Sequence, residues 1–291
     1  MLTTYQHPEL LVSTEWLADN LNKPGLQIYD CTTYLKSPDL NTPYQVVSGH
    51  DDFLAAHVPG AAFLDLQAQL SDNDSAYRFT MPTPAQFAAS MSSAGVSDNS
   101  SLILYSRGSM QWATRIWWML RSIGFDRAAI LDGGWEKWQQ ESRPVASGEH
   151  HYSPGKLSVQ ARDGLFADRD QVLTAIDGNS TTVINALSAE LHKGHSARYG
   201  RPGRIPGSVN VPAGELRDPS TLTLVTAPTA SRHFVQAGVS SDKPVIIYCG
   251  GGIAATLDAF VLHQLGHQTI AVYDHSLNEW SNQADLPVES D

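Results

Sequence analysis

Short apolar runs alternate with helical segments along the whole chain. Residues 26–30 and 182–185 have the composition of buried strands, and residues 83–94 and 115–123 are predicted helices. Gly124 follows the second helix, where a glycine C-cap is common. Strands that alternate with helices predict an α/β fold in which each mostly parallel sheet carries helices on both faces.

The chain also repeats itself. Four blocks of sequence recur in the same order: 57–62 and 204–209, 94–97 and 237–240, 102–106 and 245–249, 130–138 and 272–280. Tyr248 follows Tyr105 by 143 residues. A repeat of this length indicates a duplicated domain. We expect one domain at 1–148 and a second at 149–291, joined by a linker at 147–158 that contains Gly, His, Ser and Pro without periodicity.

The second copy places a cysteine where a predicted strand meets a predicted helix, 254–265. Cys249 is followed by Gly250, Gly251, Gly252, Ile253 and Ala254. Glycines let the backbone curl around the sulfur with several N–H groups pointing inward, and the helix adds the positive end of its dipole. Both effects favour the anionic sulfur, which is the nucleophilic form. The sequence therefore predicts a reactive thiol at Cys249, whereas Cys31 is interpreted as a small buried hydrophobic residue.

The order of these motifs resembles that of the tandem rhodanese-domain sulfurtransferases, which include thiosulfate and 3-mercaptopyruvate sulfurtransferases. The resemblance extends over 12–287 and is carried by His57-Val-Pro-Gly, by Tyr-Cys249-Gly-x-Gly and by Asp274-x-Ser-x-x-Glu-Trp. It implies two rhodanese-like domains, the first inactive and the second catalytic. Ser106 stands at the cysteine position of the first copy, and an aliphatic hydroxyl cannot form a persulfide.

The resemblance also implies a ping-pong reaction. Cys249 would take a sulfane sulfur from a small anionic donor, thiosulfate or 3-mercaptopyruvate, and would pass it to a thiol, cyanide or a protein. No metal or organic cofactor is expected, because transfer through a persulfide needs neither. The loop departs from both family types: Gly250 and Gly251 replace the cations of the thiosulfate type, and Gly251 also replaces the hydroxyl residue of the mercaptopyruvate type. The two donors therefore both remain open.

Three arginines and a histidine are candidates for substrate binding. Arg198 lies close to the place of a family substrate arginine, and Arg201 and Arg204 follow it. We expect at least one of them to bind the anionic donor through paired hydrogen bonds, and a solvated basic loop is the alternative. His57 would orient or protonate the substrate, or would hydrogen-bond its own loop. Asp274 is interpreted as a turn residue.

Composition narrows the partners. The net charge of −11 argues against nucleic acid, which requires a basic face. The chain has no apolar run of about 18 residues, so no membrane span is expected. Residues 1–9 lack the basic and apolar regions of a secretory signal, so a cytoplasmic location is expected. His192 and His195 lack further ligands at metal-site spacing, and no metal site is predicted there.

Two other functions are compatible with a cysteine loop on such a fold. A dual-specificity phosphatase would need an arginine six positions after the cysteine, where this chain has Ala255. The second alternative is a rhodanese-like carrier or binding module that delivers sulfur to a partner protein. Retention of Cys249 argues against a pure binding module, but the sequence does not separate a carrier from a small-molecule enzyme.

Overall fold

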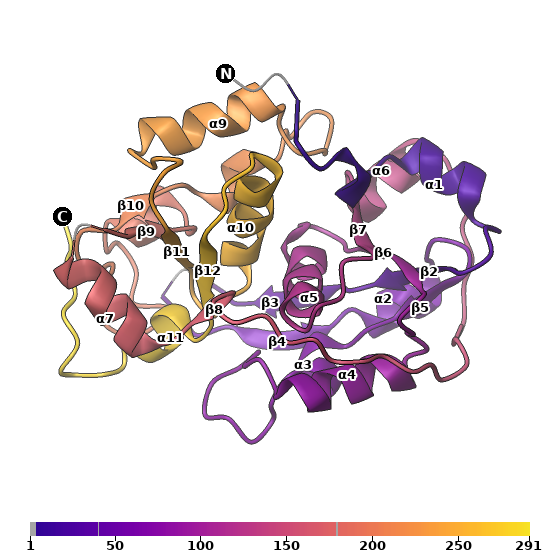
Figure 1. Ribbon diagram of the computed structural model, residues 1–291, viewed down its shortest axis with the longest axis horizontal. Helices are drawn as coiled ribbons and strands as arrows, with labels where there is room; N and C mark the ends of the chain where they lie inside the picture. Colours follow the sequence, from indigo (N-terminus) through magenta and orange to yellow (C-terminus); the bar gives the residue numbers. More distant parts are fainter. Residues whose placement is uncertain (1–3, 40, 179) are drawn as a thin grey trace.

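The computed structural model of the chain describes residues 4–39, 41–178 and 180–291, and two five-stranded parallel sheets organise it (Figure 1). In spatial order the first sheet contains β1 (Leu11–Val12), β7 (Ala128–Leu131), β6 (Ser101–Tyr105), β2 (Leu26–Asp30) and β5 (Ala61–Phe63). The second contains β8 (Phe166–Ala167), β12 (Ile270–Tyr273), β11 (Val245–Tyr248), β9 (Thr182–Asn185) and β10 (Val209–Asn210). Each sheet takes its strands in the same order along the chain, so the duplication predicted from the sequence is also a duplication of topology.

Helices cover both faces of the first sheet, as predicted. They are α1 (Thr14–Asn20), α2 (His50–Ala55), α3 (Leu66–Leu70), α4 (Pro84–Ser93), α5 (Gln111–Ser122) and α6 (Gly134–Gln140). Neighbouring residues of β2 point to opposite faces, because side chains alternate along a strand. Ile28 joins a core with Phe53 of α2 and Trp138 of α6, whereas Tyr29 joins a second core that includes Phe87 of α4. That second core continues into the other half of the molecule.

The second half has its own helices and 3₁₀ turn. They are α7 (Arg169–Asp177), α8 (Ala189–His192), the turn η2 (Ala213–Leu216), α9 (Ala227–Gln236), α10 (Ala254–Gln264) and α11 (Ser276–Trp280); a further turn, η1 (Pro8–Leu10), lies near the start of the chain. Predicted and observed helix bounds agree closely at α4 and α10. Helix α5 begins at Gln111, four residues before the predicted start, because Gln111 and Thr114 interrupt the apolar pattern of its first turn. Gly124 has a φ of 90° just beyond this helix, as a C-cap glycine should.

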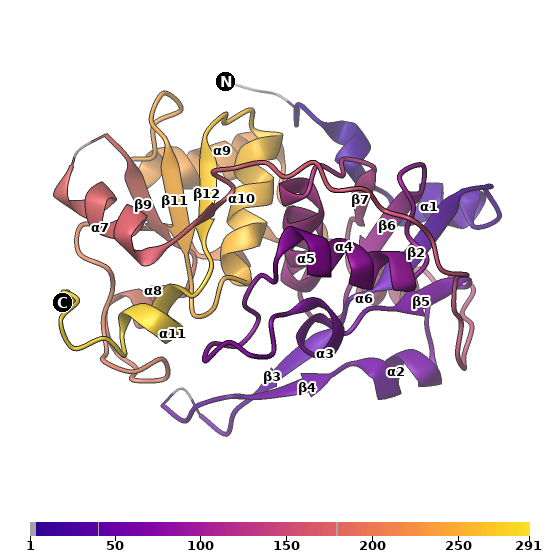
Figure 2. The ribbon, with the colours of Figure 1, turned by 60° about the horizontal axis from the view of Figure 1, so that its bottom comes forward.

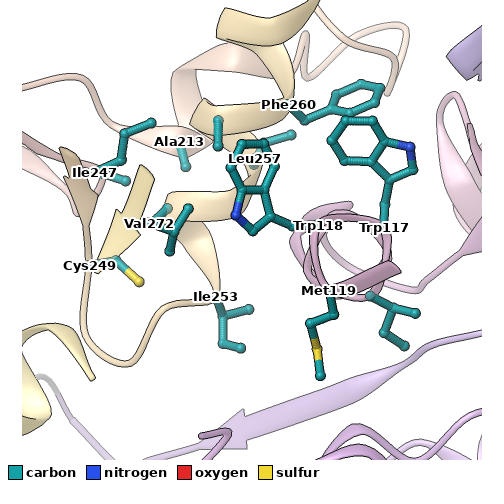
Figure 3. Packing of buried hydrophobic residues seen from close by; sticks show 14 of the residues in the cluster. Trp117, Trp118, Met119, Ala213, Ile247, Cys249, Ile253, Leu257, Phe260 and Val272 are labelled. Atoms are coloured by element: carbon teal, nitrogen blue, oxygen red, sulfur yellow. The ribbon is translucent and has the colours of Figure 1, made fainter. Parts of the chain in front are cut away.

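Helices α5 and α10 join the two halves. They occupy equivalent places in the two copies, and the Oγ1 atoms of Thr114 and Thr256 lie 3.0 Å apart between them. Trp117 of α5 packs edge-on against Phe260 of α10, with ring centroids 4.9 Å apart (Figure 3). Because both helices are largely buried here, their contact fixes one half against the other. Trp117 therefore packs at the interface between the two halves.

The segment expected to link the domains has no helix or strand at 147–158. It continues along the first half: the Tyr152 hydroxyl donates to the Gly60 carbonyl at 2.6 Å, and Gly155 N–H donates to the Ser92 carbonyl at 2.8 Å. The next stretch is also held there, since Gln160 N–H donates to the Ile123 carbonyl at 2.8 Å. The boundary between 148 and 149 stays a prediction.

Candidate active site

Cys249 directly follows β11, the central strand of the second sheet, at its carboxyl end (Figure 3). Its residue is 2% exposed. Its backbone N–H donates to Ser276 Oγ at 3.0 Å, and its carbonyl accepts from Leu277 N–H at 3.1 Å. The first residues of α11 therefore fix the backbone of Cys249 through two hydrogen bonds. The carboxyl edge of a parallel sheet is where such folds bind their ligands.

Close neighbours account for the three glycines of the loop. A Cβ at Gly250 would overlap the Tyr199 ring, and a Cβ at Gly251 would lie 2.6 Å from Asn278 Nδ2. At Gly252 a Cβ would overlap the Asp274 carbonyl, and its φ of 72° is in the region that favours glycine. The three glycines thus let the Tyr199 ring, the Asn278 amide and the Asp274 carbonyl approach the loop backbone closely.

Several loop N–H groups have no protein partner. Within the described part of the chain, no backbone or side-chain group accepts a hydrogen bond from the N–H groups of Gly250, Gly251 or Ile253. The N-terminus of α10, at Ala254, follows immediately and adds the positive end of a helix dipole. Unpaired N–H groups beside a sulfur can bind the anionic forms of that sulfur and of a substrate.

A buried arginine of the first half supports the loop. Arg115 of α5 is fully buried, and its Nη1 donates to the Gly252 carbonyl at 3.2 Å. Its Nη2 forms an ion pair with Asp274 Oδ1 at 2.7 Å and donates to the Phe79 carbonyl at 2.6 Å. Asp274 Oδ2 also accepts from Met81 N–H at 2.8 Å. In addition to the turn role expected for it, Asp274 therefore links the first half to the segment that supports the Cys249 loop.

Two tyrosines close the other side. Tyr44 precedes β4 (Gln45–Ser48), which forms an antiparallel hairpin with β3 (Thr33–Lys36), and Figure 2 shows this hairpin extending from the first half toward α11. The Tyr44 hydroxyl accepts a hydrogen bond from Asn278 Nδ2 at 3.1 Å, and the Tyr44 and Tyr199 rings meet edge-on at 6.1 Å. Burial raises the pKa of Tyr44, and burial together with the charge of Cys249 raises the pKa of Tyr199. Both phenols are therefore neutral donors near pH 7.

The structure separates the three candidate arginines. Arg198 adjoins Tyr199, donates from Nη2 to the Asp39 carbonyl at 2.9 Å, and has a buried Nε without a hydrogen-bond partner among the described residues. The guanidinium of Arg201 donates to backbone carbonyls of the C-terminal segment: Trp280, Ser281, Gln283 and Leu286. Arg204 pairs with the carboxylates of Glu289 and Asp291. Substrate contact stays a prediction for all three, and the geometry favours Arg198.

His57 lies in the first half and takes the second of its two expected roles. Its Nδ1 donates to the Phe53 carbonyl at 2.8 Å, and its ring stacks on Phe53 at 4.2 Å. It is 2% exposed, so its own loop encloses it. Cys31 is also fully buried, and burial raises the pKa of its thiol well above the ordinary value. A contact between His57 and substrate stays a prediction.

Comparison with known proteins places the chain. The rhodanese-like domain model matches residues 13–141 and 170–283. The chain belongs to the rhodanese family. The 3-mercaptopyruvate sulfurtransferase of Escherichia coli (strain K12) is 34% identical over 289 residues, which are 96% of this chain and 97% of that protein. The crystal structure of SseA from Escherichia coli, a 3-mercaptopyruvate sulfotransferase, matches with a TM-score of 0.80 at 30% identity, covering 92% of this chain and 98% of that one.

A further relative differs in its described role. The sulfur carrier protein TtuD of Thermus thermophilus is 28% identical over 298 residues, 98% of each chain. This tandem rhodanese is an enzyme, a sulfurtransferase, on the strength of its likeness to the Escherichia coli protein. Among the residues described, no helix is long and apolar enough to cross a membrane, and no three His, Cys, Asp or Glu side chains group as metal ligands would.

Proposed function

We propose that this rhodanese transfers sulfur from 3-mercaptopyruvate to a thiol or cyanide through a persulfide on Cys249. The observation that carries the proposal is the position of Cys249 at the carboxyl end of the central strand, beside unpaired N–H groups of Gly250, Gly251 and Ile253. Such groups stabilise a thiolate and a persulfide anion. The first copy offers no thiol at this position, which holds Ser106.

The chemistry takes two balanced steps. The Cys249 thiolate attacks the sulfur of 3-mercaptopyruvate, so that an S–S bond forms and the C–S bond breaks. The electron pair of the broken bond stays on the carbon, which takes a proton to give pyruvate. A thiolate or cyanide then attacks the outer sulfur of the persulfide, and the Cys249 thiolate leaves with the electron pair of the S–S bond.

The choice of donor rests on two features. The loop side chains after Cys249 carry no cation, which disfavours the dianion thiosulfate, and the relatives named above support 3-mercaptopyruvate. A carboxylate would find a partner in Arg198, whose buried Nε has no acceptor within the described chain. Arginine binds carboxylates through two parallel hydrogen bonds.

Mass spectrometry tests the proposal. The purified protein is incubated separately with 3-mercaptopyruvate and with thiosulfate, and intact and peptide masses are measured. We expect one added sulfur on the Cys249 peptide, from 3-mercaptopyruvate and removable by cyanide. Cys249→Ser should abolish both the addition and the turnover, and Cys31→Ser should leave both intact. Full turnover by Cys249→Ser would overturn the mechanism, and loading by thiosulfate alone would overturn the donor.

A protein acceptor is the second candidate, which the likeness to a sulfur carrier protein supports. It shares the first step and differs only in the second. The loaded protein, freed of donor, is mixed with cyanide or with dithiothreitol, and loss of the added sulfur is timed. Rapid discharge would favour small acceptors. Discharge far slower than loading, with both reagents, would favour a protein acceptor.

A further inference from the structure

The catalytic loop brings no hydroxyl group of its own to the sulfur. From Cys249 to Ala255 its side chains are hydrogen or aliphatic, apart from the thiol itself. Ser276 lies beneath the loop, but its Oγ accepts from the N–H groups of Cys249 and Gly252 and donates to the Tyr273 carbonyl at 2.7 Å. That hydroxyl is therefore fully engaged. A side-chain donor for the reacting sulfur has to come from elsewhere.

The Tyr44 hydroxyl lies on the side of Gly251 toward which a Cβ would project. A Cβ built at Gly251 would lie 2.6 Å from Asn278 Nδ2 and 3.7 Å from Tyr44 Oη. The amide and the phenol thus border the space that a side chain at this loop position would occupy. An amide nitrogen only donates, so Tyr44 Oη is the acceptor of the 3.1 Å bond from Asn278. The proton of Tyr44 is free to point elsewhere, since no other described group is bonded to this hydroxyl.

The ring of Tyr44 is held firmly in this place. Its residue is 7% exposed, and Arg78 anchors it: Nη1 donates to the Tyr44 carbonyl at 2.6 Å, and the guanidinium lies 5.3 Å from the ring centroid. Asn278 is fixed in turn, because its backbone N–H donates to the Gly250 carbonyl at 2.8 Å. Burial raises the pKa of Tyr44, so the donor proton is retained at neutral and mildly alkaline pH.

We propose that Tyr44 is a catalytic residue supplied by the first half: its hydroxyl donates a hydrogen bond to the sulfur carried on Cys249. Asn278 orients the hydroxyl by donating to its oxygen. Tyr44 keeps its proton throughout, so the two transfer steps balance as written above. The inference rests on the proposed persulfide chemistry and adds to it a donor from a different domain. The first copy is then part of the active site in addition to its structural role.

Tyr44→Phe is the direct test, because it removes a single oxygen atom and keeps the ring. With 3-mercaptopyruvate as donor and dithiothreitol as acceptor, we expect kcat to fall about ten- to a hundred-fold, the usual effect of losing a hydrogen bond to a charged group. KM should change less than about threefold. The matched control is Tyr34→Phe on the same hairpin, whose hydroxyl donates to Asp52 Oδ2 at 2.6 Å away from the loop. It should keep wild-type kcat.

A second variant separates a chemical role from a structural one. Gly251→Ser, added to Tyr44→Phe together with Asn278→Ala to make room, places a hydroxyl on the loop itself. This triple variant should recover most of the kcat that Tyr44→Phe loses. Asn278→Ala alone removes the donor that orients the Tyr44 hydroxyl, so it should lower kcat, but by less than Tyr44→Phe. If Tyr44→Phe does not fold, an unchanged kcat in Asn278→Ala would overturn the inference. Wild-type kcat in a folded Tyr44→Phe variant would overturn the inference. Absence of any persulfide in the wild-type protein would instead overturn the proposed function.

Discussion

The two copies of the rhodanese domain end their central strands in loops that start alike and differ in what occupies them. Ser106 Oγ donates to the Ser109 carbonyl at 2.6 Å, and Gly108 N–H donates to Glu136 Oε1 at 2.6 Å. In the second copy Gly251 N–H, which corresponds to Gly108 N–H, has no partner within the described residues, and the same holds for Gly250 N–H. Groups of the first half therefore accept the N–H hydrogen bonds of the first loop, whereas the unpaired N–H groups of the second loop can bind a ligand.

The residue after the serine or cysteine completes the contrast. Arg107 follows Ser106, and its side chain folds back into the first half, where its guanidinium lies 4.2 Å from the Trp135 ring centroid and 3.7 Å from Asp30. Gly250 follows Cys249, and the Tyr199 ring takes the space beside it. The Arg107 side chain therefore ties the first loop to its own half, whereas the glycine at the equivalent position of the second loop leaves room for a ring from a neighbouring segment.

A pair of aspartates shows where the symmetry holds and where it breaks. Asp132 accepts the Leu224 N–H of the second half at 2.8 Å, and Asp274 accepts the Met81 N–H of the first half at 2.8 Å. Only Asp274 also meets an arginine, Arg115. Among the residues that the structure describes, none forms an ion pair with Asp132, and burial raises the pKa of its carboxyl group to about 6. Both copies therefore have the backbone contact to the other half, and of these two aspartates only Asp274, beside the Cys249 loop, forms an ion pair with an arginine.

The largest expected effect comes from breaking that ion pair. Arg115→Leu leaves the Asp274 carboxylate without its cation and removes the donor to Gly252, so the free energy of unfolding should fall by about 3–5 kcal/mol. Urea denaturation at pH 7.5 measures it. Adding Asp274→Asn should recover part of the loss, since the unpaired charge disappears. A loss below about 1 kcal/mol would show that the pair does not hold the two halves together.

Asp132→Asn should have a smaller effect of opposite sign. Well below pH 3.8 the carboxyl group is protonated in both the folded and unfolded states. As pH rises, the unfolded chain loses this proton first, so the folded state loses stability until about pH 6. Asparagine keeps the acceptor for Leu224 and removes the titration. At pH 8 the free energy of unfolding of the variant should exceed that of wild type by about 2–3 kcal/mol, and at pH 3 the two should be nearly equal.

The exposed Asp163→Asn is the matched control for this experiment, and it should change unfolding at neither pH. Equal stability of Asp132→Asn and wild type at pH 8 would mean that Asp132 is ionised without cost. The two copies would then not differ in how they treat this carboxylate.

Much of this fold and part of the site follow from sequence pattern alone. Residue order alone predicts the strands at 26–30 and 182–185 and the loop after Cys249, because these are local features. It also gives the repeat, because matching blocks can be compared directly. The arginines were harder to assign. Three of them in one short loop suggested an anion clamp, but Arg201 and Arg204 bind carbonyl and carboxylate groups near the C-terminus, which no local pattern could reveal.

The contributions of the first half to the site were missed for the same reason. Arg115 contacts Gly252 across 137 residues of sequence, and Tyr44 contacts Asn278 across 234. One signal was present: a single arginine among the apolar residues of 112–120 has to find a partner when that helix is buried. For Tyr44, the segments 33–36 and 45–48 show no apolar-polar alternation, so the sequence predicts neither their hairpin nor the direction in which it extends.

The smallest expected effect tests the contrast between the loops most directly. Ser106→Cys places a thiol at the position equivalent to Cys249, so a difference in residue type alone would predict a second sulfur-accepting site. We expect no added sulfur at residue 106 in a Cys249→Ser background. Glu136 already accepts the Gly108 N–H, and the Arg107 side chain is bonded within the first half, so the loop offers fewer N–H groups to an anionic sulfur. Peptide mass spectrometry after exposure to 3-mercaptopyruvate measures this. Uptake would mean that the residue type at position 106 alone keeps the first copy from accepting sulfur, and that the hydrogen bonds within this loop do not matter for it.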